Sequence, residues 1–147
     1  MSKANDEAPE AKPTVADIEL AEKVANGKNE RSAKVRSSKL VSALEKSSKE
    51  VQTFCEKTEK SCQQPKNDTD CDTKRKKCVE MKQIIADATQ AKTEADSKGF
   101  FVGCEKYVRN DHEHAKCVEG KIYTFTTTLS VLEGELKYVQ DIINKNT

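Results

Sequence analysis

The residues best suited to chemistry in this 147-residue chain are its six cysteines, none of which belongs to a Cys-x-x-Cys pair. An even number of spaced cysteines is typical of a disulfide framework, which persists in oxidising compartments. The pattern therefore predicts three disulfides. The alternative is that the thiols are free or bind a metal ion. Four of the cysteines follow one another at intervals of seven, nine and seven positions: Cys55, Cys62, Cys71 and Cys78.

Helical geometry selects the pairing within this group of four. Cysteines seven positions apart on one helix lie about 10.5 Å apart along its axis, beyond the roughly 7 Å between Cα atoms that a disulfide spans. The chain must therefore turn back between the second and third cysteines, about which the four positions are symmetric. An antiparallel helical hairpin with that centre predicts two nested bonds, Cys55–Cys78 and Cys62–Cys71.

The remaining pair, Cys104 and Cys117, predicts a second chain reversal. On one continuous helix these residues would lie about 19 Å apart, so a bond between them requires a turn. Their midpoint falls between Asn110 and Asp111. Both residue types favour helix starts, and we expect Asp111 to be the N-cap of the following helix.

The only cluster of metal-ligand residue types lies between these two cysteines and contains His112 and His114. A Cys2His2 zinc site is the alternative interpretation. Two residues two apart on a helix diverge by about 200°, however, and the spacing matches no standard zinc finger. We expect a solvated helix start with no metal and no other cofactor. Because no Ser or Cys accompanies the histidines in a catalytic motif, we expect no enzymatic activity.

Two further segments are candidate binding residues. The densest basic run is Lys74-Arg75-Lys76-Lys77, which could contact an acidic protein or glycan; the alternative is a solvated helix face. With a formal net charge of +1 and few aromatic residues, the chain is not expected to bind nucleic acid sequence-specifically. The apolar pair Phe100 and Phe101 is a second candidate, and the alternative is that it packs against the last helix.

Compartment and targeting follow from composition. No run approaches the roughly 18 apolar residues of a membrane span, and the first residues lack the apolar core of a signal peptide. We expect a mature secreted sequence in which a start Met replaces the signal peptide. The Asn67-Asp68-Thr69 sequon makes Asn67 a candidate glycosylation site in an exposed turn.

The elements that must position these residues are helices, because apolar residues recur at intervals of three and four. The clearest run is Ile122, Phe125, Leu129, Leu132, Leu136, Val139 and Ile143. We predict helices over 33–64, 70–109 and 112–146. Pro65 ends the first helix, and two glycines weaken the middle one without ending it.

The predicted fold is an all-α, elongated, antiparallel three-helix bundle with up-down-up topology, stapled by three disulfides. Residues 1–14 should be a disordered tail, and 15–147 a single domain. Segment 15–26 either extends the first helix or folds back as a short fourth helix, because Asn26-Gly27 favours a pause or a bend.

This architecture favours a secreted, non-enzymatic interaction module that binds an extracellular protein or an acidic glycan through helix faces or hairpin tips. The alternative is a carrier that holds a lipid or another small apolar ligand between its helices. A third option, from a different compartment, is an intracellular coiled-coil or zinc protein.

Overall fold

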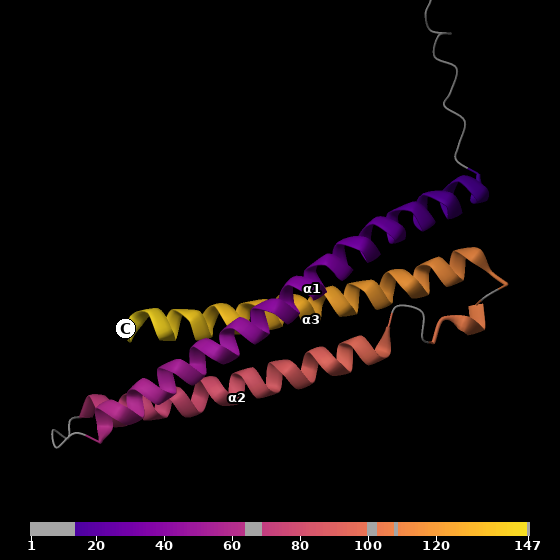
Figure 1. The fold of residues 1–147 in the computed structure, drawn as a ribbon. Coiled ribbons are helices and arrows are strands. Elements are labelled where there is room, and N and C mark those ends of the chain that lie inside the picture. The colour runs from indigo at the N-terminus through magenta and orange to yellow at the C-terminus, as the bar shows by residue number, and fades with distance from the viewer. Residues whose placement is uncertain (1–13, 64–68, 100–102, 108, 147) are drawn as a thin grey trace, which may run out of the picture.

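The fold is an antiparallel bundle of three long helices. The computed structural model describes residues 14–63, 69–99, 103–107 and 109–146. In chain order the elements are α1 (Val15–Cys62), α2 (Thr69–Lys98), the short 3-10 helix η2 (Glu105–Tyr107) and α3 (Asp111–Lys145). Figure 1 shows α2 and α3 running alongside α1, which crosses α3 near the middle of the rod. The predicted all-α, up-down-up bundle is confirmed.

Helix α1 is continuous over 48 residues, or about 72 Å at 1.5 Å per residue. Its first turn is closed by a capping box: the Asp17 backbone N–H donates to Thr14 Oγ1 at 3.1 Å, and the Thr14 N–H donates to Asp17 Oδ2 at 3.0 Å. Segment 15–26 thus extends the first helix, which was one of the two predicted alternatives.

Of the pause or bend predicted at Asn26-Gly27, the pause is wrong, because α1 passes through both residues without a break. The physical reason is tertiary. Asn26 is buried against α3, and its Nδ2 donates to the carbonyl oxygen of Ala115 at 2.9 Å. An amide that ordinarily ends a helix by binding its own backbone binds the neighbouring helix instead.

The middle helix is shorter than predicted and ends at Lys98 rather than at position 109. Gly99 has a φ of 61° and Gly103 a φ of 91°. This left-handed backbone is disfavoured for residues with a Cβ and is a common way to end a helix. After this break the chain enters the turn that contains Cys104 and then η2.

The start of α3 differs from the prediction by one residue. Asn110, not Asp111, is the N-cap, and its side-chain oxygen accepts a hydrogen bond from the Glu113 backbone N–H at 3.0 Å. Asp111 occupies the first helical position, where its negative charge favours the positive end of the helix dipole.

All six cysteines are paired, as predicted, in the bonds Cys55–Cys78, Cys62–Cys71 and Cys104–Cys117. The Cα atoms of the bonded pairs lie 5.6, 5.6 and 5.7 Å apart. The first two bonds join α1 to α2 near the hairpin end. The third joins the segment that precedes η2 to α3, so it ties down the connection rather than the body of α2.

The core is a thin seam along the bundle axis. Its main cluster draws on all three helices, with Leu44, Met81 and Leu129 among its members, and a smaller cluster surrounds Cys104. Each helix therefore buries one stripe and leaves its other sides to solvent. Within the described residues, no helix is both long and apolar enough to cross a membrane.

Candidate functional site

The outer side of α1 carries a row of cations, which we call the basic stripe. At 100° per residue its members fall within an arc of about 80° on the helix. Between positions 28 and 60 this arc holds ten residues, of which seven are Lys or Arg and none is Asp or Glu. The other three are Val35, Ser42 and Thr53, and all ten are exposed. The stripe consists of Lys28, Arg31, Lys39, Lys46, Lys49, Lys57 and Lys60.

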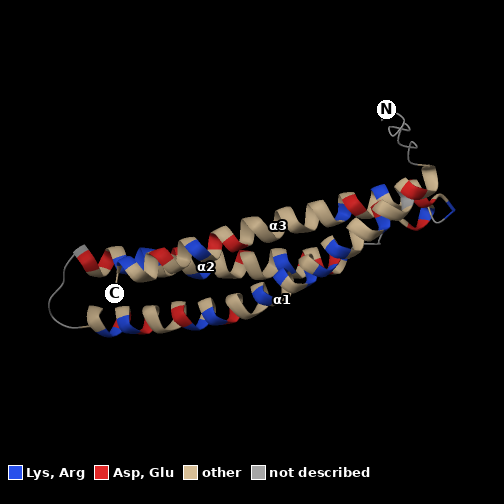
Figure 2. Ribbon diagram, turned by 90° about the horizontal axis from the view of Figure 1, so that it is seen from above, with Lys and Arg blue, Asp and Glu red and all other residues tan. Residues whose placement is uncertain are grey.

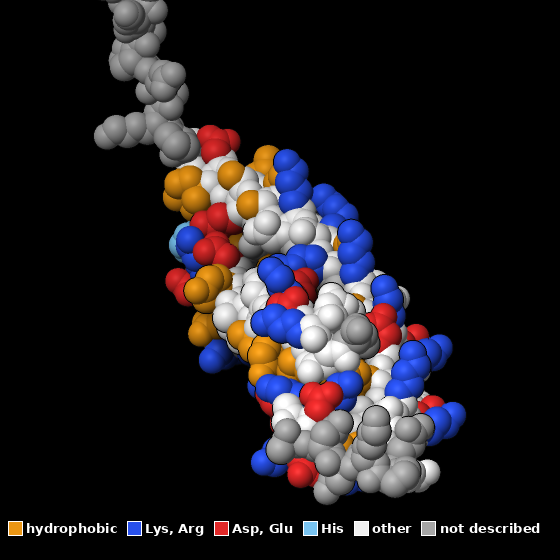
Figure 3. Space-filling model, turned by 90° about the vertical axis from the view of Figure 1, so that its left-hand side faces the viewer, with side chains coloured by type: hydrophobic (Ala, Val, Ile, Leu, Met, Phe, Trp, Pro, Cys, Tyr) orange, Lys and Arg blue, Asp and Glu red, His pale blue; other side chains and the backbone are white. Residues whose placement is uncertain are grey.

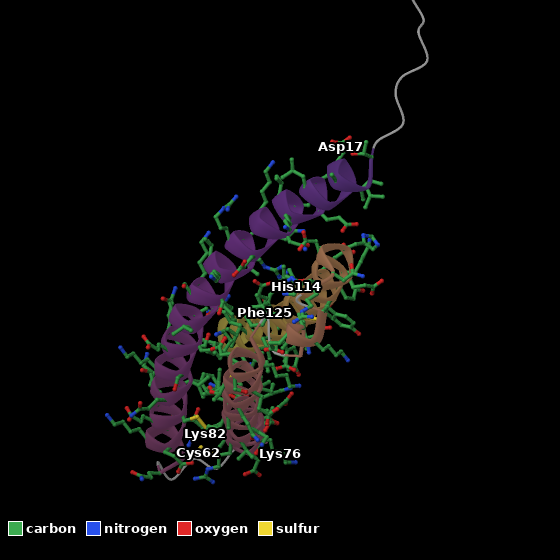
Figure 4. The ribbon with its side chains drawn as sticks, turned by 90° about the vertical axis from the view of Figure 1, so that its right-hand side faces the viewer. Asp17, Cys62, Lys76, Lys82, His114 and Phe125 are labelled. Atoms are coloured by element: carbon green, nitrogen blue, oxygen red, sulfur yellow. A yellow bond between two sulfur atoms is a disulfide. The ribbon has the colours of Figure 1, made fainter. Side chains whose placement is uncertain are left out.

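The basic stripe lies on the side of α1 roughly opposite the core. The buried positions of α1, such as Ala33, Leu40 and Val51, repeat along its inner side. In Figure 4, long side chains with nitrogen tips project from α1 away from the other two helices. Figure 3 shows Lys and Arg side chains along one edge of the molecule. From Lys28 to Lys60 the stripe extends over about 48 Å, and the helix backbone holds the cations in line.

Most charges of the stripe are not neutralised by neighbours. Among the residues that the structure describes, only Lys46 of the stripe has a carboxylate within ion-pair distance: its Nζ lies 3.9 Å from Glu50 Oε1. Figure 2 shows both Lys and Arg and Asp and Glu on all three helices. The chain as a whole is nearly neutral, at +1. The stripe is thus a local row of cations in a chain that carries almost no net positive charge.

The predicted basic run at the start of α2 is different, because most of its charges are paired. Lys74 Nζ lies 3.7 Å from Asp70 Oδ2, and Lys77 Nζ lies 3.9 Å from Glu80 Oε2. Arg75 Nε donates to Glu59 Oε1 of α1 at 3.0 Å, and this hydrogen bond raises the pKa of the guanidinium. Lys76 alone in this run has no ion pair within the described part of the chain. The run is therefore a weaker candidate for anion binding than the stripe.

Sequence reasoning missed the stripe, although a signal was present. The seven residues are separated by intervals of 3, 8, 7, 3, 8 and 3, so members recur 7, 11 and 18 positions apart, and these separations approach whole numbers of helical turns. A periodicity search restricted to apolar residues does not detect this pattern. Neither the net charge of the chain nor the density of local basic runs reveals the spacing of these cations.

His112 and His114 are not brought together with the cysteines as metal ligands. His112 Nδ1 lies 3.2 Å from Glu22 Oε2, in an ion-pair cluster that joins the first part of α1 to the start of α3. The Cys104–Cys117 bond consumes both sulfurs, so neither can act as a thiolate ligand. No group of three or more His, Cys, Asp or Glu side chains in the described ranges could hold a metal ion.

The other predicted site residues, Phe100, Phe101 and Asn67, lie outside the described residues. The chain was also compared with known proteins: no family model, curated protein or solved structure matches it. Any functional argument therefore depends on the residues themselves. The arrangement that they provide is a continuous row of exposed cations along one helix of a disulfide-linked bundle.

Proposed function

We propose that this protein is a secreted, non-enzymatic binding module that captures an extended anionic glycan along the basic stripe of α1. The observation that carries the proposal is the composition of that face: seven of its ten residues from 28 to 60 are cationic and none is acidic. A linear polyanion lying along the stripe would place its charges opposite several lysines at once. The free energy would come mainly from release of the counterions condensed on the polyanion.

The chemistry of the stripe favours a glycan chain over the other anionic macromolecules. Six of the seven cations are lysines, which act as hydrated point charges rather than as bidentate forks. The face contains no aromatic side chain on which a nucleic-acid base could stack. Val35 is its only large apolar residue, so it offers neither the anchors of a protein hot spot nor the inserting face of a membrane-surface helix.

The disulfides support the location that this function requires. All six cysteines are bonded, and such frameworks persist outside the cytosol. Sulfated and carboxylated glycans are polyanions of the extracellular space, where a stapled rod also resists unfolding. The bundle supplies rigidity, because a 48-residue helix held by two partner helices keeps its cations in register before any ligand arrives.

The experiment that tests this proposal is a salt series with a heparin fragment as the probe. The slope of log affinity against log salt is about −0.7 per cation engaged on a single-stranded polyanion. Seven cations predict a slope of about −5, so affinity should fall by about a thousandfold between 50 and 200 mM NaCl. Replacing Lys28, Arg31 and Lys39 with Gln should reduce the slope to about −3.

A matched control removes three positive charges elsewhere. Lys76, Lys98 and Lys137 are exposed residues of α2 and α3, and none has an ion pair within the described residues. Their triple Gln variant has the same net charge as the stripe variant and should keep the full slope. Equal losses in the two variants would show that only net charge matters, and a slope near zero in the parent protein would refute glycan capture.

A further inference from the structure

A groove at the hairpin end of the rod is a second candidate site, distinct in shape from the stripe. It encloses about 650 Å³ and is lined by the last turns of α1, the start of α2 and the end of α3. Because α1 and α3 cross near the middle of the bundle, they diverge toward this end (Figure 1). The volume lies within the range of roughly 300 to 1,000 Å³ that is usual for small-molecule sites.

The floor of the groove is formed by two apolar side chains, and the other nine residues of its lining are polar or charged. Phe54 of α1 belongs to the main core cluster and is 6% exposed, and Ile143 of α3 packs against the same cluster. Thr58, a polar residue that is 5% exposed, also lines the groove. A ligand in the groove would therefore place hydrocarbon on Phe54 and Ile143, where removing it from water is favourable.

The rim of the groove is cationic. Lys49 and Lys57 contribute from α1 and Lys74 from α2, and Glu50 is the one carboxylate in the lining. Lys74 contacts Asp70 at 3.7 Å. Lys49 and Lys57 contact no carboxylate within the described residues. Two lysine charges are therefore available to an anion at the edge of an apolar floor.

We propose that this groove binds a single-chain amphiphilic anion such as a fatty acid. The acyl chain would lie on Phe54 and Ile143, and its carboxylate would lie among Lys49, Lys57 and Lys74. The inference goes beyond glycan capture, although the groove shares Lys49 and Lys57 with the stripe. Lys74 belongs to the groove alone, so the two sites can be tested separately.

The test compares, by isothermal titration calorimetry, three probes with the same twelve-carbon chain. Dodecanoate and dodecyltrimethylammonium are used below their micellar concentrations, and dodecanol is used below its solubility limit. Dodecanoate should bind about fivefold more tightly than dodecanol, because its charge meets the rim. The cation should bind more weakly than either. Each methylene that reaches the floor strengthens binding by up to about fourfold, so octanoate should bind more weakly than dodecanoate. Contacts between the chain and the Ile143 methyl groups, detected by NMR, would locate the ligand.

Two matched variants separate the groove from general charge effects. Lys74→Glu should weaken dodecanoate binding about fivefold or more, whereas Lys76→Glu, on the same helix but outside the groove lining, should leave it unchanged. Both should keep the salt slope for the heparin fragment. Equal affinity for the three probes, or equal effects of the two variants, would overturn the groove assignment while leaving the stripe proposal intact.

Discussion

The nested disulfides give a quantitative prediction about what holds the hairpin end together. In the chain-entropy account, a crosslink stabilises the fold by restricting the unfolded chain, and the effect grows with the length of the closed loop. The outer bond, Cys55–Cys78, spans 23 positions, and the inner bond, Cys62–Cys71, spans 9. Acting alone, these bonds would contribute about 3.4 and 2.6 kcal/mol.

Nesting changes the two values. With the inner bond in place, the outer bond closes an effective loop of about 14 residues and contributes about 3.0 kcal/mol. The pair together contributes about 5.6 kcal/mol, so losing only the inner bond should cost about 2.2 kcal/mol. Replacing each bonded pair with Ala removes one buried and one half-buried sulfur in both cases, since Cys55 and Cys71 are buried. The difference in free energy of unfolding between the two variants therefore reflects the lengths of the loops that the bonds close.

The assay is urea unfolding of the two paired-alanine variants and of the variant that lacks both bonds, followed by far-UV circular dichroism. We expect loss of the outer bond to lower the free energy of unfolding more than loss of the inner bond does. The largest decrease should occur when both bonds are absent. Because whole domains have about 5 to 15 kcal/mol of stability, the variant without either bond should be close to unfolding. If loss of the inner bond costs as much as loss of the outer bond, the loop-entropy reasoning is refuted.

Two further predictions concern α1. Replacing Asn26 with Ala removes the buried hydrogen bond to the Ala115 carbonyl and should lower the free energy of unfolding by about 1 kcal/mol. The control, Asn29→Ala at an exposed position of the same helix, should change the free energy of unfolding little. Equal losses in the two variants would contradict the role of the Asn26 hydrogen bond. The Thr14 backbone N–H donates a hydrogen bond to Asp17 and lowers the pKa of its carboxyl group. The stabilisation of the helix start by the capping box is therefore fully present above the ordinary carboxyl pKa. It is lost as pH falls through the lower pKa of the folded state. The protection factors of the first-turn amides, which correct for the intrinsic pH dependence of exchange, should therefore decrease as pH falls through that value, and Asp17→Asn should abolish this decrease.

Much of the fold was predictable from the sequence because its signals are local and periodic. Cysteine intervals of seven around a common centre are compatible with only one pairing in a helical hairpin, and the three-four spacing of apolar residues identified α3 nearly to its ends. The predicted end of α2 was wrong because a glycine within a helical pattern weakens a helix without necessarily ending it, so the prediction continued the helix through Gly99 and Gly103. The bond from Cys104 to Cys117 needs the chain to leave the helix first, and the left-handed backbone at both glycines allows that.

The candidate site was less accessible to sequence reasoning. The periodicity of the basic stripe is present in the sequence, but a helix face becomes a binding surface only when nothing covers or neutralises it. The run at Lys74–Lys77 illustrates the point, since Arg75 is paired by Glu59 from the neighbouring helix. A partner from a different helix cannot be read from local spacing. The groove floor likewise combines Phe54 and Ile143, which lie on different helices.

The sequence by itself determined the helical class, the topology and the disulfide pairing, because each depends on spacing along one chain and on the fixed rise and rotation of a helix. Only the tertiary structure decided that α1 continues through Asn26, that α2 ends at Lys98, and that the cations of α1 face solvent along about 48 Å. Those outcomes depend on which side of each helix is buried and on which side chains meet across helices. That choice is made by packing and by partners distant in sequence, so local propensity alone does not decide it.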